Sequence, residues 1–124
     1  MTDTAKAVKL AQRARSVDPL SIDPLLAAAD AEIFAGADAK SRKQRADEKR
    51  AFAVALGYLK KATEIQPRNS EAWFELGLFD LLDRGCPRAA LPAFSRFTVL
   101  NGQDPRNVYY AQTLAKVNSG KPIC

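Results

Sequence analysis

Paired carboxylates are the side chains of this 124-residue chain whose spacing could support acid–base chemistry. Glu71 and Glu75 stand one helical turn apart, and Asp47 and Glu48 are adjacent. Neither pair is accompanied by a glycine-rich phosphate loop, a nucleophile beside a base, or the spacing of metal ligands. We therefore expect no catalytic residue, no metal site and no cofactor, and we expect that the chain is not an enzyme.

The composition narrows the chemistry further, because the chain has no histidine and only two cysteines. The absence of histidine removes the commonest general base, the usual Ser-His and Cys-His pairs and most zinc sites. Cys86 precedes a proline in an expected turn, and Cys124 is the last residue. We interpret both as thiols without a function. Sequence spacing does not decide whether they form a disulfide.

The net charge of +5 is concentrated in one short segment. Positions 40–50 hold two acidic and six basic residues, and the latter define the basic patch: Lys40, Arg42, Lys43, Arg45, Lys49 and Arg50. The patch has three interpretations: a solvated helix extension or loop, a contact with an acidic protein or an anionic membrane surface, or a contact with nucleic acid. Nucleic acid is the least favoured, because the patch has no aromatic side chains for base stacking and the rest of the chain is near neutral.

The sequence shows neither a membrane span nor a secretion signal. No run of about 18 apolar residues occurs, although a spanning helix needs one. The first ten residues lack the apolar centre of a signal peptide. We expect a cytoplasmic location, and a length of 124 residues suits one domain with its own core.

Apolar residues recur with helical spacing along most of the chain, and no segment alternates as a strand does. Proline and glycine divide the pattern into segments, with Gly36 as the expected end of the second helix. Ser21, Asn69 and Asn107 are expected N-caps. The central helix has apolar residues on nearly every face, so it must be covered on several sides. The predicted helices span residues 3–17, 22–35, 51–66, 69–84, 87–100 and 108–118, which makes the domain all-α.

An internal repeat organises these helices. Three helix starts share a proline, any residue and a short polar side chain: Pro19-Leu20-Ser21, Pro67-Arg68-Asn69 and Pro105-Arg106-Asn107. Apolar residues, all alanines except one leucine, precede the first two prolines at the same offsets, as Ala7, Ala11 and Ala14 and as Ala55, Leu59 and Ala62. Each proline closes one helix and the polar side chain caps the next, so the repeat has a physical cause.

In these features the chain resembles the tetratricopeptide repeat (TPR), a helix-turn-helix unit of about 34 residues. Trp73, Leu76 and Gly77 match the first half of the motif, with Asp80 where tyrosine is usual, and Ala90, Phe94 and Phe97 match most of the second half. The resemblance implies antiparallel helix pairs in a short right-handed α-solenoid of about six helices. Its parts would be a half repeat at 3–19, a repeat at 21–67 with a charged insert at 37–50, a repeat at 69–105 and a terminal helix at 107–118.

The resemblance also implies a function, because TPR proteins commonly hold a peptide or protein segment in their concave groove. We expect an interaction scaffold whose groove is mainly apolar and suits an amphipathic helix or an extended apolar segment. The carboxylate clamp of chaperone-binding members has no counterpart here. The expected groove residues are Leu26, Asp30, Ile33, Phe34, Phe74, Leu78, Leu81, Leu82, Tyr109 and Gln112, and the alternative is that the leucines only pack against neighbouring helices.

A second resemblance is one of style. Alanine-rich stretches such as Asp-Arg-Gly-Cys-Pro-Arg-Ala-Ala look like bacterial repeat domains that follow membrane glycan ligases or polymerases of the O-antigen ligase type. This alternative implies a regulatory or assembly domain attached to a membrane protein upstream. The opening half repeat favours a fragment of a longer protein, whereas Met1 favours an intact one.

Overall fold

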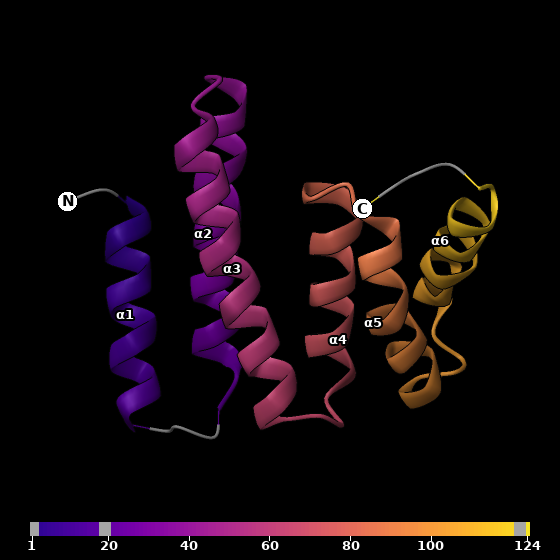
Figure 1. Ribbon diagram of the computed structural model, residues 1–124. Coiled ribbons are helices and arrows are strands. Elements are labelled where there is room, and N and C mark those ends of the chain that lie inside the picture. The colour runs from indigo at the N-terminus through magenta and orange to yellow at the C-terminus, as the bar shows by residue number, and fades with distance from the viewer. Residues whose placement is uncertain (1–2, 18–20, 121–123) are drawn as a thin grey trace. The chain divides into compact units, whose positions relative to one another are not determined.

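The structure, a computed structural model, describes residues 3–17, 21–120 and 124, without the side chains of 14–17 (Figure 1). Pro19 and Leu20, in the first predicted helix start, lie outside the described residues. The described part contains helices and no strand, which confirms the all-α class. The chain divides into two compact units, Met1–Gln66 and Pro67–Cys124.

In the described residues of the first unit there are three helices: α1 (Asp3–Val17), α2 (Asp23–Ser41) and α3 (Arg45–Ile65). Its core is built from small residues and leucines at helical spacing, and these are buried almost completely: Leu25, Ala28, Ala29, Ala55, Leu59 and Ala62. Small side chains let helices approach closely, and α2 and α3 lie side by side as a long hairpin in Figure 1.

The predicted helix end at Gly36 is wrong, because α2 continues to Ser41. A Cβ atom at Gly36 would overlap the ring of Phe52, so this glycine is where α3 packs directly against the backbone of α2. Ala39 and Ala51 are buried further along the same contact. The periodicity of the segment was carried by single alanines, which are weak apolar signals.

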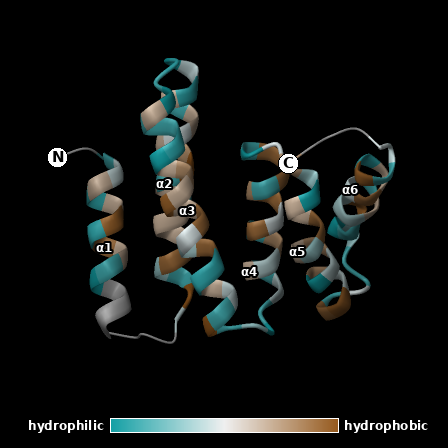
Figure 2. Ribbon diagram, viewed as in Figure 1, coloured by the Kyte–Doolittle hydropathy of each residue, from teal (hydrophilic) through white to brown (hydrophobic). Residues whose placement is uncertain are grey.

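The charged segment 37–50 is therefore not a loop. It is the tip of the α2–α3 hairpin, closed by a turn of three residues in which Lys43 has a φ of 59°. Both helices continue into it, which matches the interpretation as a solvated helix extension. Figure 2 shows the closing turn as hydrophilic.

The second unit contains α4 (Ser70–Leu78), a π-helical turn η1 (Phe79–Asp83), α5 (Pro87–Leu100), a 3₁₀ turn η2 (Pro105–Asn107) and α6 (Val108–Asn118). Its core is an aromatic cluster formed by Phe74, Leu81, Ala90, Phe94 and Phe97, with Trp73, Leu78, Tyr109 and Tyr110 packed against it. The predicted helix at 69–84 thus ends in a π-helical turn. There the buried carboxylate of Asp80 accepts a hydrogen bond of 2.6 Å from Arg84.

The caps of the predicted helix starts differ from one another. Asn69 is confirmed as the cap of α4, since its Oδ1 accepts the Glu71 N–H at 3.1 Å. Asn107 is wrong as a cap: its side chain instead donates to the Asn101 carbonyl at 2.9 Å. Asp104 caps the preceding turn by accepting the Arg106 N–H at 2.8 Å. At α2 the cap position is Ile22, while Ser21 Oγ accepts the Asp23 N–H at 3.4 Å.

Two further observations concern a disulfide in the second unit and the hydrophobicity of the helices. Cys86 and Cys124 form a disulfide that joins the start of α5 to the C-terminal residue. The sequence had left the pairing of these two cysteines open, and the structure shows them bonded to each other. Across the residues that the structure describes, no helix combines the length and the hydrophobicity that a bilayer span requires.

Candidate functional site

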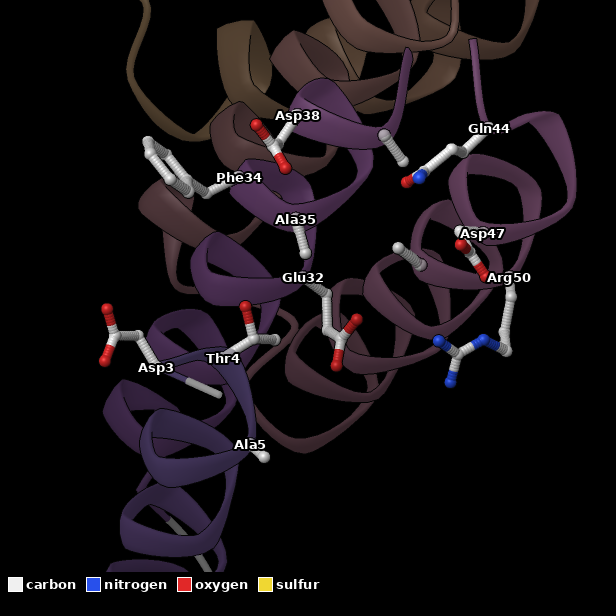
Figure 3. Close-up of a pocket in the computed structure, with 12 residues that line it drawn as sticks. Asp3, Thr4, Ala5, Glu32, Phe34, Ala35, Asp38, Gln44, Asp47 and Arg50 are labelled. Atoms are coloured by element: carbon white, nitrogen blue, oxygen red, sulfur yellow. The ribbon is translucent and has the colours of Figure 1, made fainter. Parts of the chain in front are cut away.

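A pocket of about 430 Å³ lies in the first unit, where the start of α1 meets the second half of α2 and the start of α3 (Figure 3). Its floor is made of small apolar residues, among them Ala35, Ala39 and Ala51. Its remaining lining is polar apart from Phe34 and Ala5, and consists of Asp3, Thr4, Glu32, Asp38, Gln44, Asp47 and Arg50.

Helical spacing explains why these residues meet. Glu32, Ala35 and Ala39 follow one another at offsets of three and four on α2, so they share one face. On α3, Arg50 and Ala51 follow Asp47 at offsets of three and four, so each of them lies close to Asp47 on the helix surface. Asp47 and Asp3 also stand in the first turns of their helices, where a carboxylate is stabilised by the helix dipole. The presence of these two carboxylates is thus explained in part by their effect on helix stability.

The pocket is negatively charged, although the chain as a whole carries +5. Four carboxylates and one guanidinium line it, which leaves three net negative charges. Asp38 forms an ion pair at 3.2 Å with Arg42, and Arg42 does not line the pocket. Within the described part of the chain, no ion pair engages Glu32, Asp47 or Arg50. Figure 3 shows Glu32 on α2 with Asp47 and Arg50 on α3 to one side of it.

Phe34 is the most exposed large apolar residue of the described chain, at 78%. It belongs to the predicted groove and lies at the edge of the pocket, with its ring directed away from Asp47 and Arg50 (Figure 3). A single exposed aromatic residue is common on protein surfaces. Here the exposed ring borders a pocket.

The other predicted groove residues of the first unit lie along the same helix. Leu26, Asp30 and Ile33 recur at offsets of four and three on α2, so they form one strip that leads to Phe34. Leu26 and Ile33 are half-buried, and none of the three lines the pocket. Partial burial raises the pKa of the Asp30 carboxyl above its ordinary value.

In the second unit, most of the predicted groove residues take part in packing. Phe74 and Leu81 are buried in the aromatic cluster, and Leu78 and Tyr109 pack against it. The alternative of packing therefore describes Leu78 and Leu81. Leu82 and Gln112 are exposed, Leu82 at 63%.

Sequence reasoning missed a polar cluster around Arg106. Its guanidinium donates two hydrogen bonds to the Glu71 carboxylate, at 3.0 and 2.7 Å, and two to Asp104, at 3.0 and 2.9 Å. Its centre lies 4.7 Å from the Phe74 ring and 5.1 Å from the Phe97 ring. Hydrogen bonds to Asp104 and then to Glu71 raise the pKa of Arg106, and the Arg106 side chain lowers the pKa of Asp104. The repeat motif had treated position 106 as a spacer between Pro105 and Asn107.

The basic patch remains on the surface of the hairpin tip. All six of its side chains are exposed. Arg42 pairs with Asp38, and Arg50 reaches the pocket. Four cations, Lys40, Lys43, Arg45 and Lys49, make no ion pair with any residue that the structure places.

The carboxylates do not converge on a point. Among the described residues, no three His, Cys, Asp or Glu side chains stand close enough to hold a metal ion. Glu71 and Glu75 are the pair with the spacing for acid–base chemistry, and both carboxylate oxygens of Glu71 accept hydrogen bonds from Arg106.

Searches against protein-family models and among curated proteins return no match.

Proposed function

We propose that this chain is a non-enzymatic binding module that holds a peptide or a protein segment on its first unit. The observation that carries the proposal is the exposed Phe34 side chain beside a pocket of about 430 Å³ with a floor of alanines. Ligand pockets of proteins are typically about 300–1,000 Å³, with an apolar lining and a few polar groups at defined places.

The strip along α2 extends this surface beyond the pocket. Leu26 and Ile33 are half-exposed on the side of α2 that continues to Phe34, so an extended or helical segment would find apolar contacts over about two helical turns. The TPR resemblance supports the same role, because first helices of TPR motifs line the ligand groove. The groove proposed here is confined to the first unit.

A selection from a random peptide library tests the proposal. Peptides retained by the wild-type chain should be released by Phe34→Asp, because an added carboxylate faces a surface that is already negative. They should be retained by Leu82→Asp, a matched change of an exposed apolar residue in the second unit. Failure to enrich any peptide, or peptides insensitive to Phe34→Asp but lost with Leu82→Asp, would contradict it.

The disulfide leads us to infer an oxidising compartment in place of the cytoplasm that the sequence predicted. Disulfides such as Cys86–Cys124 persist in secreted and periplasmic proteins and are rare in the reducing cytoplasm. This observation favours the alternative of a domain attached to a membrane glycan ligase or polymerase and facing the periplasm. Alkylation of protein extracted under acid quench tests it: both cysteines should resist a maleimide reagent until a reductant is added. Immediate labelling of both would contradict it.

A further inference from the structure

We propose that the pocket selects a segment that carries lysine or arginine, an inference that rests on the proposed function and specifies its ligand. Asp38 is paired with Arg42, so the other lining residues, three carboxylates and one guanidinium, leave two net negative charges in a chain whose overall charge is +5. Such a local reversal of sign attracts a cationic group at short range and disfavours an acidic one.

The lining also fits the shape of these side chains. Lysine and arginine have an aliphatic stem that packs on apolar surface and a charged head that stays near polar groups. The buried Ala39 and Ala51 offer a small apolar floor for such a stem. Glu32 stands on α2 and Asp47 on α3, and neither has a cationic partner within the described residues, so both are available to the charged head.

An exposed aromatic ring adds a second means of holding a cation. Phe34 lies at the edge of the pocket, and the face of its ring attracts a lysine or arginine placed over it. The same ring also accepts an apolar neighbour in the bound segment. The best ligand is therefore a segment in which basic and apolar residues alternate.

A metal ion fits the site less well than an organic cation. The carboxylates come from three helices and no three of them, among the residues placed by the structure, share a point. Calcium and magnesium need several oxygen ligands within about 2.0–2.6 Å of the ion. Separated carboxylates suit extended cationic side chains, each of which needs one or two acceptors.

Calorimetric titration of the intact chain with three short peptides tests the inference. The probes are acetyl-Gly-Lys-Leu-Lys-Gly-amide and the two peptides in which glutamine or glutamate replaces both lysines. Because exposed ion pairs each contribute about 0.2–1 kcal/mol, the lysine peptide should bind about three- to tenfold more tightly than the glutamine peptide, and the glutamate peptide most weakly.

Two variants locate the effect. Glu32→Gln should remove about half of the preference for lysine in logarithmic terms, and Glu32→Lys should abolish or reverse it. Glu64→Gln is the matched control, since Glu64 is exposed on α3 and does not line the pocket, and it should bind the three peptides as the wild type does.

The outcomes separate this inference from the proposed function. Equal affinities for all three peptides, lost together in Phe34→Asp, would overturn the preference for basic segments and leave the binding module standing. A preference for lysine that survives Glu32→Lys would place the cation site elsewhere and overturn the inference. Failure of the lysine peptide to bind would overturn it too, while the library selection judges the proposed function independently.

Discussion

Arg106 forms two hydrogen bonds with Glu71, which lies 35 positions earlier in the sequence. Nη1 donates to Oε2 at 3.0 Å, and Nη2 donates to Oε1 at 2.7 Å. This paired contact ties the turn before α6 to the first turn of α4. The same guanidinium covers the rings of Phe74 and Phe97. A bidentate pair stacked on aromatic rings requires the planar fork of arginine.

Arg106→Ala should therefore lower the free energy of unfolding by about 1–3 kcal/mol, because it removes charged hydrogen bonds and the stacking on the rings together. Arg106→Lys should recover only part of that loss. Denaturant unfolding measures both. Arg96→Ala is the control, as Arg96 is exposed on α5, and its effect should stay within about 0.5 kcal/mol. Equal stabilities of Arg106→Ala and Arg96→Ala would contradict the structural role of the contact.

The stability of the second unit should depend on pH through Asp104. Its pKa is lowered in the folded chain by the hydrogen bond from the Arg106 side chain, so the ionised form stabilises the fold. That stabilisation is complete above the pKa of the unfolded chain, about 3.9, and is lost as the pH falls through the lower folded pKa. The difference in stability between wild type and Asp104→Asn should thus be constant near neutral pH and narrow below about pH 4. A difference that widens in acid would reverse the assigned sign.

Gly77→Ala should destabilise the second unit. An added Cβ would lie 2.5 Å from Cε1 of Phe94, in the middle of the aromatic cluster, and overpacking of this kind costs about 1–3 kcal/mol. Gly57→Ala provides the opposite expectation, since nothing lies within 4 Å of a Cβ there. Alanine is favoured over glycine in a helix by about 0.5–1 kcal/mol, so this variant should be more stable than the wild type. Thermal unfolding of the two variants side by side would reveal any error in the sign of either effect.

Reduction of the disulfide should also destabilise the second unit. The bond closes a loop between residues separated by 38 positions. A disulfide that closes a loop of this length typically raises the free energy of unfolding by about 2–4 kcal/mol. Denaturant unfolding with and without reductant measures the effect. The double variant Cys86→Ala, Cys124→Ala should have the free energy of unfolding of the reduced wild type. Its free energy of unfolding should not change when reductant is added. A reduced chain as stable as the oxidised one would show that the bond constrains nothing.

Local signals in the sequence predicted most helix positions. Proline at 67 and 87 and the cap at Asn69 act through their own neighbours, so they can be read without the fold. Gly36 failed as a helix end because its role depends on Phe52, which packs against it from another helix. The conformation of a glycine is a local property, whereas its close contacts are not.

The site was predictable only in part for the same reason. Phe34 was expected on a binding surface, and it lies beside the pocket. Glu32 and Asp47 were not singled out together, since they are neighbours only after α2 folds back on α3. Arg106 occupied a variable position of the repeat motif, and nothing local indicates that Glu71 is its partner.

The most direct test of the binding module is a map of amide chemical shifts in the ¹⁵N-labelled chain titrated with a peptide retained in the library selection. The largest changes should fall on the first turn of α1, on α2 between Glu32 and Ala39, and on α3 near Asp47 and Arg50. The amide shifts of the second unit should not change. Changes centred on the second unit, or absent throughout the first at saturating peptide, would contradict the account.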